Sequence, residues 1–289
     1  MNKNPSYSEQ ELINIINENL KQSANIIYKK ATKLCKHGIV DENCYWYHSA
    51  WQYLRLLNLV SSPTWHDNFY LPELINIFCG NQELNVLVSG TADYTILAYV
   101  IYAAKVTNCN VNIDVLDTCK TPLYACKEYA KKQNYKIKTI NLNIFDHNKT
   151  NYYDVILTDA FLTRFNKTDA QGVVNKWHTL LKQNGKIITT VRVHLSNEKS
   201  SNSLVNTLNN NFIERAKENS QKLNAYINKT PDEIAQIAKT YIENMKSNSL
   251  GDDKDIINLF KEYKCKTKLK TVVGELKQTT YLEIVATKQ

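Results

Sequence analysis

The most constraining feature of this chain is a change of hydrophobic period at a single glycine, in the segment NVLVSGTADYTILA at residues 85–98. Residues 85–88 have the composition of a buried strand, and Ser89 and Gly90 break it. The apolar positions that follow have helical spacing: Ile96, Leu97, Val100 and Ile101. A strand, a tight turn and a helix in this order form the repeating unit of a parallel α/β sheet, which holds a nucleoside at such a turn.

The same alternation of strand and helix continues along the chain. The later segments with strand patterns are 110–116, 136–142, 153–158, 186–193, 266–273 and 279–286. One intervening helix is expected to open at Thr121 and Pro122, and another covers 168–181 and stops at Asn184 and Gly185. We therefore predict an α/β fold with a doubly wound, mostly parallel seven-stranded sheet whose last strand is antiparallel.

Helices are also predicted outside this alternating region. Residues 8–28 have apolar positions at helical spacing, and Ser8 with Glu11 makes a capping box at their start. A second helix is predicted at 43–59, and it is unusually aromatic. Several polar helices follow strand five, one of which opens at Thr230. The sheet is thus expected to carry an N-terminal helical extension and a helical insertion.

Length and composition are those of a folded protein with a sizeable core. The chain has 289 residues, of which 43% are hydrophobic and 22% charged. We divide it into an N-terminal helical cap, residues 1–82, and a Rossmann-like domain, residues 83–289, with the helical insertion at about 196–263. The sequence does not indicate an oligomeric state.

The net charge of +8 raises the hypothesis of a nucleic-acid partner. The basic residues are interleaved with acidic and amide residues and never form a run of five. This pattern argues against nucleic acid as the partner, although an RNA-binding or RNA-modifying protein stays as an alternative hypothesis.

The chain begins with a polar, amphipathic stretch, and no segment approaches the roughly 18 uninterrupted apolar residues of a membrane span. We therefore expect neither export nor membrane insertion. The seven cysteines contain no CxxC pair, which fits neither a disulfide framework nor a zinc site: Cys35, Cys44, Cys79, Cys109, Cys119, Cys126 and Cys265. The six histidines show no ligand spacing such as HxxxH. The expectation is a cytoplasmic protein with reduced thiols and no metal site.

Acidic residues end the strands that follow the first turn. Asp117 follows the second strand, about 27 residues beyond Gly90, near the roughly 20-residue separation expected of a ribose-binding acid. A carboxylate there accepts hydrogen bonds from two adjacent hydroxyls. Asp146 follows strand three, and Asp159 ends strand four. The competing interpretation of Asp117 is that it caps the next helix.

Together with the runs YDVILTDAFLTRF from Tyr153 and HTLLKQNGKIITTVR from His178, these features resemble the class I S-adenosylmethionine (SAM)-dependent methyltransferases over roughly residues 83–195. The resemblance implies SAM as the cofactor and residues 83–289 as its binding domain. It implies that Asp117 holds the ribose and that Asp159 faces the methionine or substrate side. The other cofactor contacts that it implies are Ser89, Gly90 and Thr91 at the methionine part and Asn143, Ile144, Phe145 and Asp146 around the adenine.

The glycine turn departs from the family pattern. The family usually has an acidic residue two places before the first glycine and further glycines after it, whereas this chain has Val88, Ala92 and Tyr94. Asp93 is then a candidate partner for the ammonium group of the cofactor, or else it caps the helix that starts there. The departure motivates an alternative in which SAM reacts at another carbon, by cyclisation, elimination or aminocarboxypropyl transfer. A dehydrogenase is disfavoured because GxGxxG is absent.

Aromatic residues near the N-terminus are the other functional candidates. A cationic sulfonium or amine is stabilised by the faces of aromatic rings. The residues that could form such a wall are Tyr45, Trp46, Tyr47, Trp51 and Trp65. Alternatively, they pack the N-terminal helices onto the sheet, but we expect at least one aromatic stripe to face the cofactor.

Methyl transfer requires an aligned and dry acceptor, and a base only for some acceptors. The candidates for a base are Tyr47, His48, His66 and Asp159. Arg55 and Arg164 are candidates to clamp a substrate carboxylate, with salt bridges inside the fold as the alternative. The sequence therefore favours a SAM-dependent methyltransferase of a small molecule, with the helical segments closing over the cofactor as a lid. A non-catalytic scaffold is the remaining alternative.

Overall fold

The computed structural model describes residues 7–35, 43–193, 202–273 and 280–289. Two of the histidines considered above, His37 and His194, lie outside these ranges. None of the helices in the described part of the chain is long and apolar enough to cross a membrane.

The centre of the fold is a seven-stranded sheet in the order β3-β2-β1-β4-β5-β7-β6. Its strands are β1 (Glu83–Ser89), β2 (Asn110–Asp117), β3 (Lys138–Asn141), β4 (Tyr153–Leu157), β5 (Leu181–Val193), β6 (Cys265–Val273) and β7 (Thr280–Lys288). Strands β1 to β5 are parallel, and β7 pairs antiparallel with both β5 and β6. The predicted fold class is confirmed.

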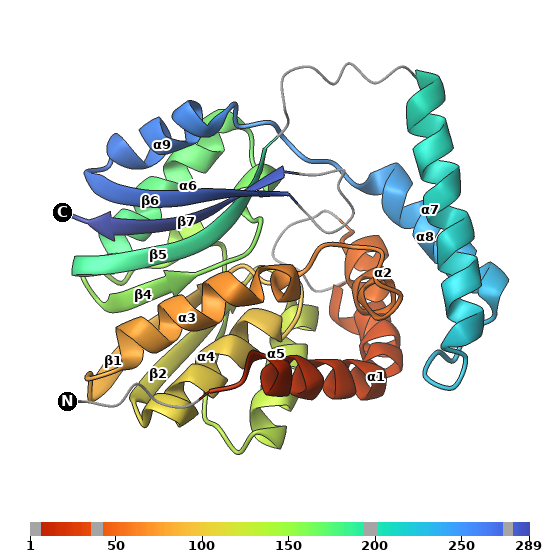
Figure 1. The fold of residues 1–289 in the computed structure, drawn as a ribbon, viewed down its shortest axis with the longest axis horizontal. Coiled ribbons are helices and arrows are strands. Elements are labelled where there is room, and N and C mark those ends of the chain that lie inside the picture. Colours follow the sequence, from red (N-terminus) through yellow and green to blue (C-terminus); the bar gives the residue numbers. More distant parts are fainter. Residues whose placement is uncertain (1–6, 36–42, 194–201, 274–279) are drawn as a thin grey trace.

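Helices cover both faces of the sheet (Figure 1). They are α1 (Glu9–Leu34), α2 (Tyr45–Leu56), α3 (Asp67–Phe78), α4 (Thr95–Thr107), α5 (Lys120–Lys132), α6 (Lys167–Leu180), α7 (Asn202–Lys222), α8 (Pro231–Asn244) and α9 (Asp253–Lys261), with the short 3-10 helices η2 (Pro63–His66), η3 (Ile144–Asp146) and η4 (Leu162–Arg164). Helices α1, α3, α4 and α5 share one hydrophobic core with the sheet, and α6 and α9 share the other.

Strand β1 explains why the sheet is buried on both faces. Successive side chains of a strand point to opposite faces. Val86 and Val88 belong to the core beneath α3 and α4, whereas Leu87 belongs to the core beneath α6. The continuous apolar run that predicted a buried parallel strand therefore contributes side chains to the hydrophobic cores on both faces of the sheet.

Helices α2, α7 and α8 form most of a third hydrophobic cluster, to which Ala24 of α1 also belongs. In Figure 1, α7 and α8 stand beyond the edge at which the parallel strands end, whereas α9 lies along β6. Trp51 and Leu54 of α2 pack with Ile234 and Ala238 of α8. Of the helices in the insertion after β5, α7 and α8 thus belong to this cluster, whereas α9 packs on the sheet. In the N-terminal part of the chain, α1 packs mainly against α2 and also adds Leu12, Ile16 and Ile27 to the core beneath α3 and α4, whereas α2 packs with both α1 and α8.

Predicted helix boundaries differ from the structure at α2, which spans Tyr45–Leu56 instead of 43–59, and at two further helices, α5 and α1. Helix α5 is capped by Cys119, whose sulfur accepts a hydrogen bond from Thr121 N, so the predicted start at Thr121 falls two residues inside the helix. Helix α6 agrees with the predicted 168–181 to within one residue at each end, but β5 begins at Leu181 instead of the predicted 186, because Leu181 already pairs with Tyr153. Helix α1 extends past the predicted end, to Leu34.

A capping box was predicted at the start of α1, and the structure has a complete one at α8, where the sequence predicted a helix start at Thr230. At α8, Thr230 and Glu233 make both reciprocal hydrogen bonds. At α1, Ser8 accepts from Glu11 N, but the Glu11 carboxylate accepts instead from the Tyr102 hydroxyl at 2.7 Å. A tertiary contact with α4 therefore replaces half of the local motif.

Candidate active site

A cavity of about 510 Å³ lies at the carboxyl edge of the sheet, between the strand ends and helices α2 and α8. The sheet contributes Gly90, Asp117 and Asp159 to its wall. The aromatic residues on its other sides include Trp46, Tyr47 and Trp51 of α2, Trp65 of η2, Phe212 of α7 and Tyr241 of α8. Its size is typical of small-molecule sites, and its place is the ligand-binding edge of an open α/β sheet.

The turn after β1 requires a glycine. Gly90 has a φ of +70°, a conformation that residues with a side chain rarely adopt. A Cβ at this position would also overlap the ring of Phe161, with three ring atoms within 2.9 Å. The Gly90 N–H donates to Leu116 O of β2 at 2.8 Å. The backbone of the turn is therefore fixed close to the neighbouring strand end.

Asp93 is fully engaged in holding this turn to α2. One carboxylate oxygen accepts from Thr95 N at 2.8 Å and from the Thr95 hydroxyl at 2.6 Å. The other accepts from Trp51 Nε1 at 2.9 Å and from the guanidinium of Arg55. Arg55 and Asp93 are both buried, so they form a buried ion pair, which is the salt-bridge alternative considered for Arg55. Arg55 is not part of the cavity wall.

Asp117 lies beside Gly90 at the end of β2. Its Oδ2 accepts from Thr91 N at 3.0 Å and its Oδ1 from Cys119 N at 2.7 Å. Burial raises the pKa of Asp117 to about 6, although His48 and the two backbone N–H groups act in the opposite direction. The carboxylate thus joins the turn after β1 to the start of α5 while it faces the cavity.

Asp159 occupies the corresponding position after β4. Its Oδ1 accepts from the hydroxyls of Tyr70 at 2.9 Å and Thr190 at 2.6 Å. Within the described ranges, no hydrogen bond reaches its Oδ2. Ala160 follows with a φ of +46° and donates its N–H to the Thr190 hydroxyl at 3.1 Å. This carboxylate is therefore oriented by two hydroxyls at the cavity wall and keeps one oxygen for a ligand.

The aromatic wall is centred on Tyr47. Its ring stacks on Tyr241 of α8, with centroids 6.0 Å apart and an interplanar angle of 21°. Trp51 lies 5.3 Å away on the same helix, and the Arg164 guanidinium lies 5.1 Å from the Tyr47 ring centre. Burial raises the pKa of Tyr47 well above its ordinary value, so its hydroxyl suits hydrogen-bond donation better than proton abstraction. The aromatic stripe of α2 serves both packing and the cavity.

Several predicted site residues do not line this cavity. The Ser89 hydroxyl is buried and accepts from Trp177 Nε1 at 2.9 Å. His66 is buried, with its Nδ1 3.0 Å from Glu283 Oε1. Tyr45 packs against Tyr28. The run after β3 also lies outside the wall: Asn143 accepts from Phe145 N within that run, Ile144 is buried beneath α6, Phe145 is exposed, and Asp146 belongs to η3.

Among the cavity-lining residues that were not predicted from the sequence are Arg192 and Tyr241. Arg192 follows Thr190 near the end of β5, and its buried Nε has no hydrogen-bond partner in the part of the chain that the structure describes. Its place at the same sheet edge as Asp159 is the signal that could have identified it. Tyr241 carries no comparable local signal, because its helix reaches the cavity only through tertiary packing.

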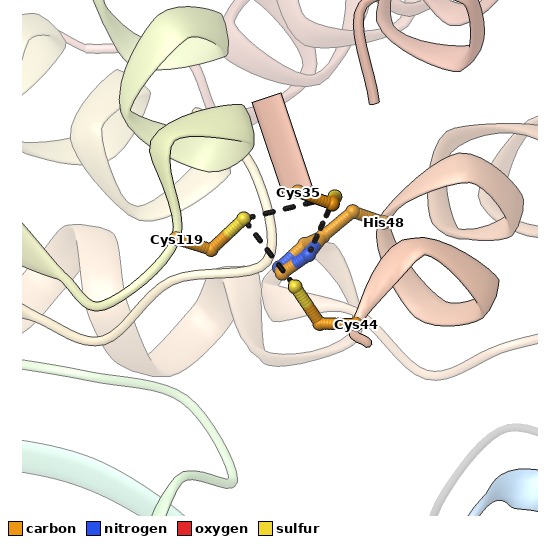
Figure 2. A group of neighbouring side chains, drawn as sticks. All are labelled: Cys35, Cys44, His48 and Cys119. Carbon is orange, nitrogen blue, oxygen red and sulfur yellow. Dashed lines mark hydrogen bonds between the residues drawn. The ribbon is translucent and has the colours of Figure 1, made fainter. Parts of the chain in front are cut away.

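The view of the cysteines as scattered thiols needs correction. Three cysteines and one histidine, from the ends of three helices, place their ligand atoms within 4.8 Å of one another; we call these residues, Cys35, Cys44, His48 and Cys119, the Cys₃His cluster (Figure 2). Burial lowers the pKa of His48, but the neighbouring sulfurs outweigh it and raise the pKa to about 10. The only local signal was the spacing of Cys44 and His48, which puts both on one face of a helix.

The same arrangement of strands and helices occurs in solved structures of methyltransferases. The CurJ carbon methyltransferase has a TM-score of 0.54 at 11% identity, over 93% of this chain and 68% of that one. Magnesium protoporphyrin IX methyltransferase from Synechocystis PCC 6803, solved with bound SAH, has a TM-score of 0.51 at 10% identity, over 96% and 99%. This is the fold of class I SAM-dependent methyltransferases. No protein-family model and no curated protein sequence matches the chain.

Proposed function

We propose that the protein is a SAM-dependent methyltransferase that acts on a small molecule in the cytoplasm. The observation that carries the proposal is the cavity at the carboxyl edge of β1, β2 and β4, where Gly90, Asp117 and Asp159 face an aromatic cover. When bound there, SAM supplies an electrophilic methyl group on a sulfonium. The solved structures with this fold include one that holds SAH, which supports the choice of cofactor.

The side chains at the sheet edge suit the polar parts of SAM. Each Asp117 oxygen accepts one backbone N–H and has lone pairs left for a ribose hydroxyl. Asp159 keeps an oxygen for an ammonium group. Asp93 is a weaker candidate for that role, because its two oxygens already accept four hydrogen bonds from the protein.

The aromatic cover accounts for the rest of the proposed chemistry. Rings around a sulfonium exclude water and stabilise the positive charge by about 0.5 to 2 kcal/mol each when desolvated. Tyr47 and Trp51 belong to this cover. A base is required only if the acceptor carries a proton, and Asp159 is then better placed than His66, which lies outside the cavity wall.

Two arginines suggest the class of acceptor. Arg164 and Arg192 both line the cavity, and Arg192 has a buried Nε without a partner in the described part of the chain. Arginine binds carboxylates and phosphates in a bidentate manner. We therefore propose a flat acceptor with an anionic group, which the aromatic rings and the arginines would bind together.

Calorimetry with SAH tests the cofactor, and SAH release from SAM tests the reaction. We expect saturable SAH binding that Asp117→Asn weakens and that Asp169→Asn, an exposed carboxylate on α6, leaves unchanged. Absence of SAH binding by the folded protein would overturn the proposal. Consumption of SAM without an acceptor would instead favour cyclisation, elimination or aminocarboxypropyl transfer, the chemistry suggested by Val88, Ala92 and Tyr94 in the turn. Binding of RNA that falls steeply with salt would favour the nucleic-acid hypothesis.

A further inference from the structure

The Cys₃His cluster lies where three helix ends meet. Cys35 caps the C-terminus of α1, Cys44 and His48 belong to the N-terminal turn of α2, and Cys119 caps the N-terminus of α5. Figure 2 shows the four side chains pointing toward one another from these separate elements. Local helix geometry alone does not bring such residues together, since Cys119 is 75 positions from Cys44.

Three of the six distances between ligand atoms of the cluster are close to those between the corners of a zinc coordination tetrahedron, and all six lie within 4.8 Å. The sulfur of Cys119 lies 3.5 Å from the sulfur of Cys44 and 3.7 Å from that of Cys35. The Cys35 sulfur lies 3.7 Å from Nδ1 of His48. Zn–S bonds of about 2.3 Å at tetrahedral angles put two sulfurs about 3.8 Å apart. An ion at the centre of the cluster therefore requires side-chain movements of no more than about 1 Å in the separation of any two ligand atoms.

We propose that the Cys₃His cluster binds one Zn²⁺ ion that fastens the ends of α1, α2 and α5 to one another. Three thiolates and one imidazole are an established ligand set for structural zinc, whereas Mg²⁺ and Ca²⁺ prefer oxygen ligands. Four protein ligands fill the tetrahedron and leave no open position for a substrate. The assigned role is therefore structural.

The surroundings of the cluster suit zinc-bound thiolates. Cys35 and Cys119 are 4% and 3% exposed, and His48 is 8% exposed. Thr121 places its hydroxyl 3.1 Å from the Cys35 sulfur and donates its N–H to the Cys119 sulfur at 3.4 Å. Such hydrogen bonds and the positive end of a helix dipole stabilise thiolate ligands. Cys119 has both, because it caps the N-terminus of α5.

A disulfide is the chief alternative use of these sulfurs. It would join two of the three cysteines, require the sulfurs to approach to about 2.05 Å, and leave the third cysteine and His48 unused. Zinc uses all four residues at nearly their present separations. The two chemistries also differ in stoichiometry and mass, so one preparation can distinguish them.

The zinc content of the full-length protein tests the proposal. The protein is purified in reducing, chelator-free buffer with added Zn²⁺, desalted, and analysed for metal by mass spectrometry and for free thiols. We expect one zinc per chain. We also expect that Co²⁺, bound in its place, gives the thiolate charge-transfer band and the strong d–d absorption of a tetrahedral site.

Matched serine variants locate the site. Cys44→Ser and Cys119→Ser are expected to bind zinc at least tenfold more weakly, whereas Cys79→Ser, a half-buried cysteine at the end of α3 outside the cluster, keeps one zinc per chain. The absorption spectrum of wild-type Co²⁺-protein does not depend on whether any variant folds. Wild-type protein without stoichiometric zinc, equal loss of zinc from Cys79→Ser, or a mass two hydrogens lower from a disulfide in the cluster would each overturn the proposal.

Discussion

Helix α2 is attached to the sheet domain at both of its ends, by different chemistry. Near its C-terminal end, Trp51 and Arg55 hydrogen-bond with Asp93 in the turn after β1. At its N-terminal end, Cys44 and His48 meet Cys119 in the turn after β2. Both attachments join a turn at the cavity wall to the helix that carries Tyr47, so together they set the shape of the cavity.

The two attachments differ in how strongly the protein's own hydrogen bonds hold them together. Asp93 accepts four hydrogen bonds with a charged partner, a network that is strong once it is buried. Sulfur is a weak donor and a weak acceptor, so the contacts among the three cysteines contribute little by themselves. The comparison suggests that one end of α2 is held by the protein alone and the other by the proposed metal ion.

Arg55→Leu is expected to have the largest effect. It leaves the buried Asp93 carboxylate without its counter-charge, and breaking a buried pair in this way costs about 3 to 5 kcal/mol of the free energy of unfolding. Urea denaturation measures this loss. Arg215→Leu is the matched control, because the same substitution at an exposed arginine of α7 should change stability little. Equal effects of the two variants would contradict the assigned role of the ion pair.

Removal of zinc is expected to come second. An ion present at a hundred times its dissociation constant stabilises the folded state by about 2.7 kcal/mol. Chelation should therefore lower the melting temperature by roughly 4 to 5 °C in a chain of this size, and added Zn²⁺ should restore it. Scanning calorimetry with and without a chelator measures the shift. A melting temperature that does not respond to either would show that the sulfur end is as self-sufficient as the Asp93 end.

Asp117→Ala tests the proposed cofactor-binding carboxylate, which lies between the two attachments. The carboxylate faces the cavity and joins the turns after β1 and β2, so its loss should weaken SAH binding by about 1 to 3 kcal/mol, the scale of a lost hydrogen bond to a charged group. Calorimetric titration gives the affinity, and the melting temperature of the variant provides the control for folding. Unchanged affinity in a folded variant would remove Asp117 from the proposed site.

Thr121→Val is expected to have the smallest effect. The substitution keeps the shape of the side chain and removes only the hydroxyl that lies 3.1 Å from the Cys35 sulfur. Loss of the hydroxyl that contacts the proposed zinc ligand Cys35 should lower zinc affinity about tenfold. Competition with a chromogenic chelator measures the affinity. The attachment through Arg55 and Asp93 should be unaffected by this substitution. If metal-free Thr121→Val loses as much free energy of unfolding as Arg55→Leu does, the two attachments are not separate.

The fold and part of the site follow from local patterns. The strand at 85–88, the turn at Gly90 and the helix after it are visible in the sequence because hydrophobic period changes within a few residues. Asp117 and Asp159 are identifiable because parallel strands all end at one edge, so an acid after a strand has a defined place. The start of β5 was misjudged because Leu181 already pairs with Tyr153 of β4, so the strand begins before Asn184 and Gly185, the residues that in the sequence separate helix from strand.

The sequence by itself determined the order of strands and helices, the glycine of the first turn and the acids at the strand ends, because each depends on neighbours along the chain. Only the tertiary structure decided that Asp93 pairs with Arg55, that Arg192 and Tyr241 reach the cavity, and that Cys35 and Cys119 meet Cys44 and His48. These contacts join segments far apart in the sequence. They arise when α1, α2 and α8 pack against one another and against the carboxyl edge of the sheet, and the spacing of residues along the chain does not predict that packing.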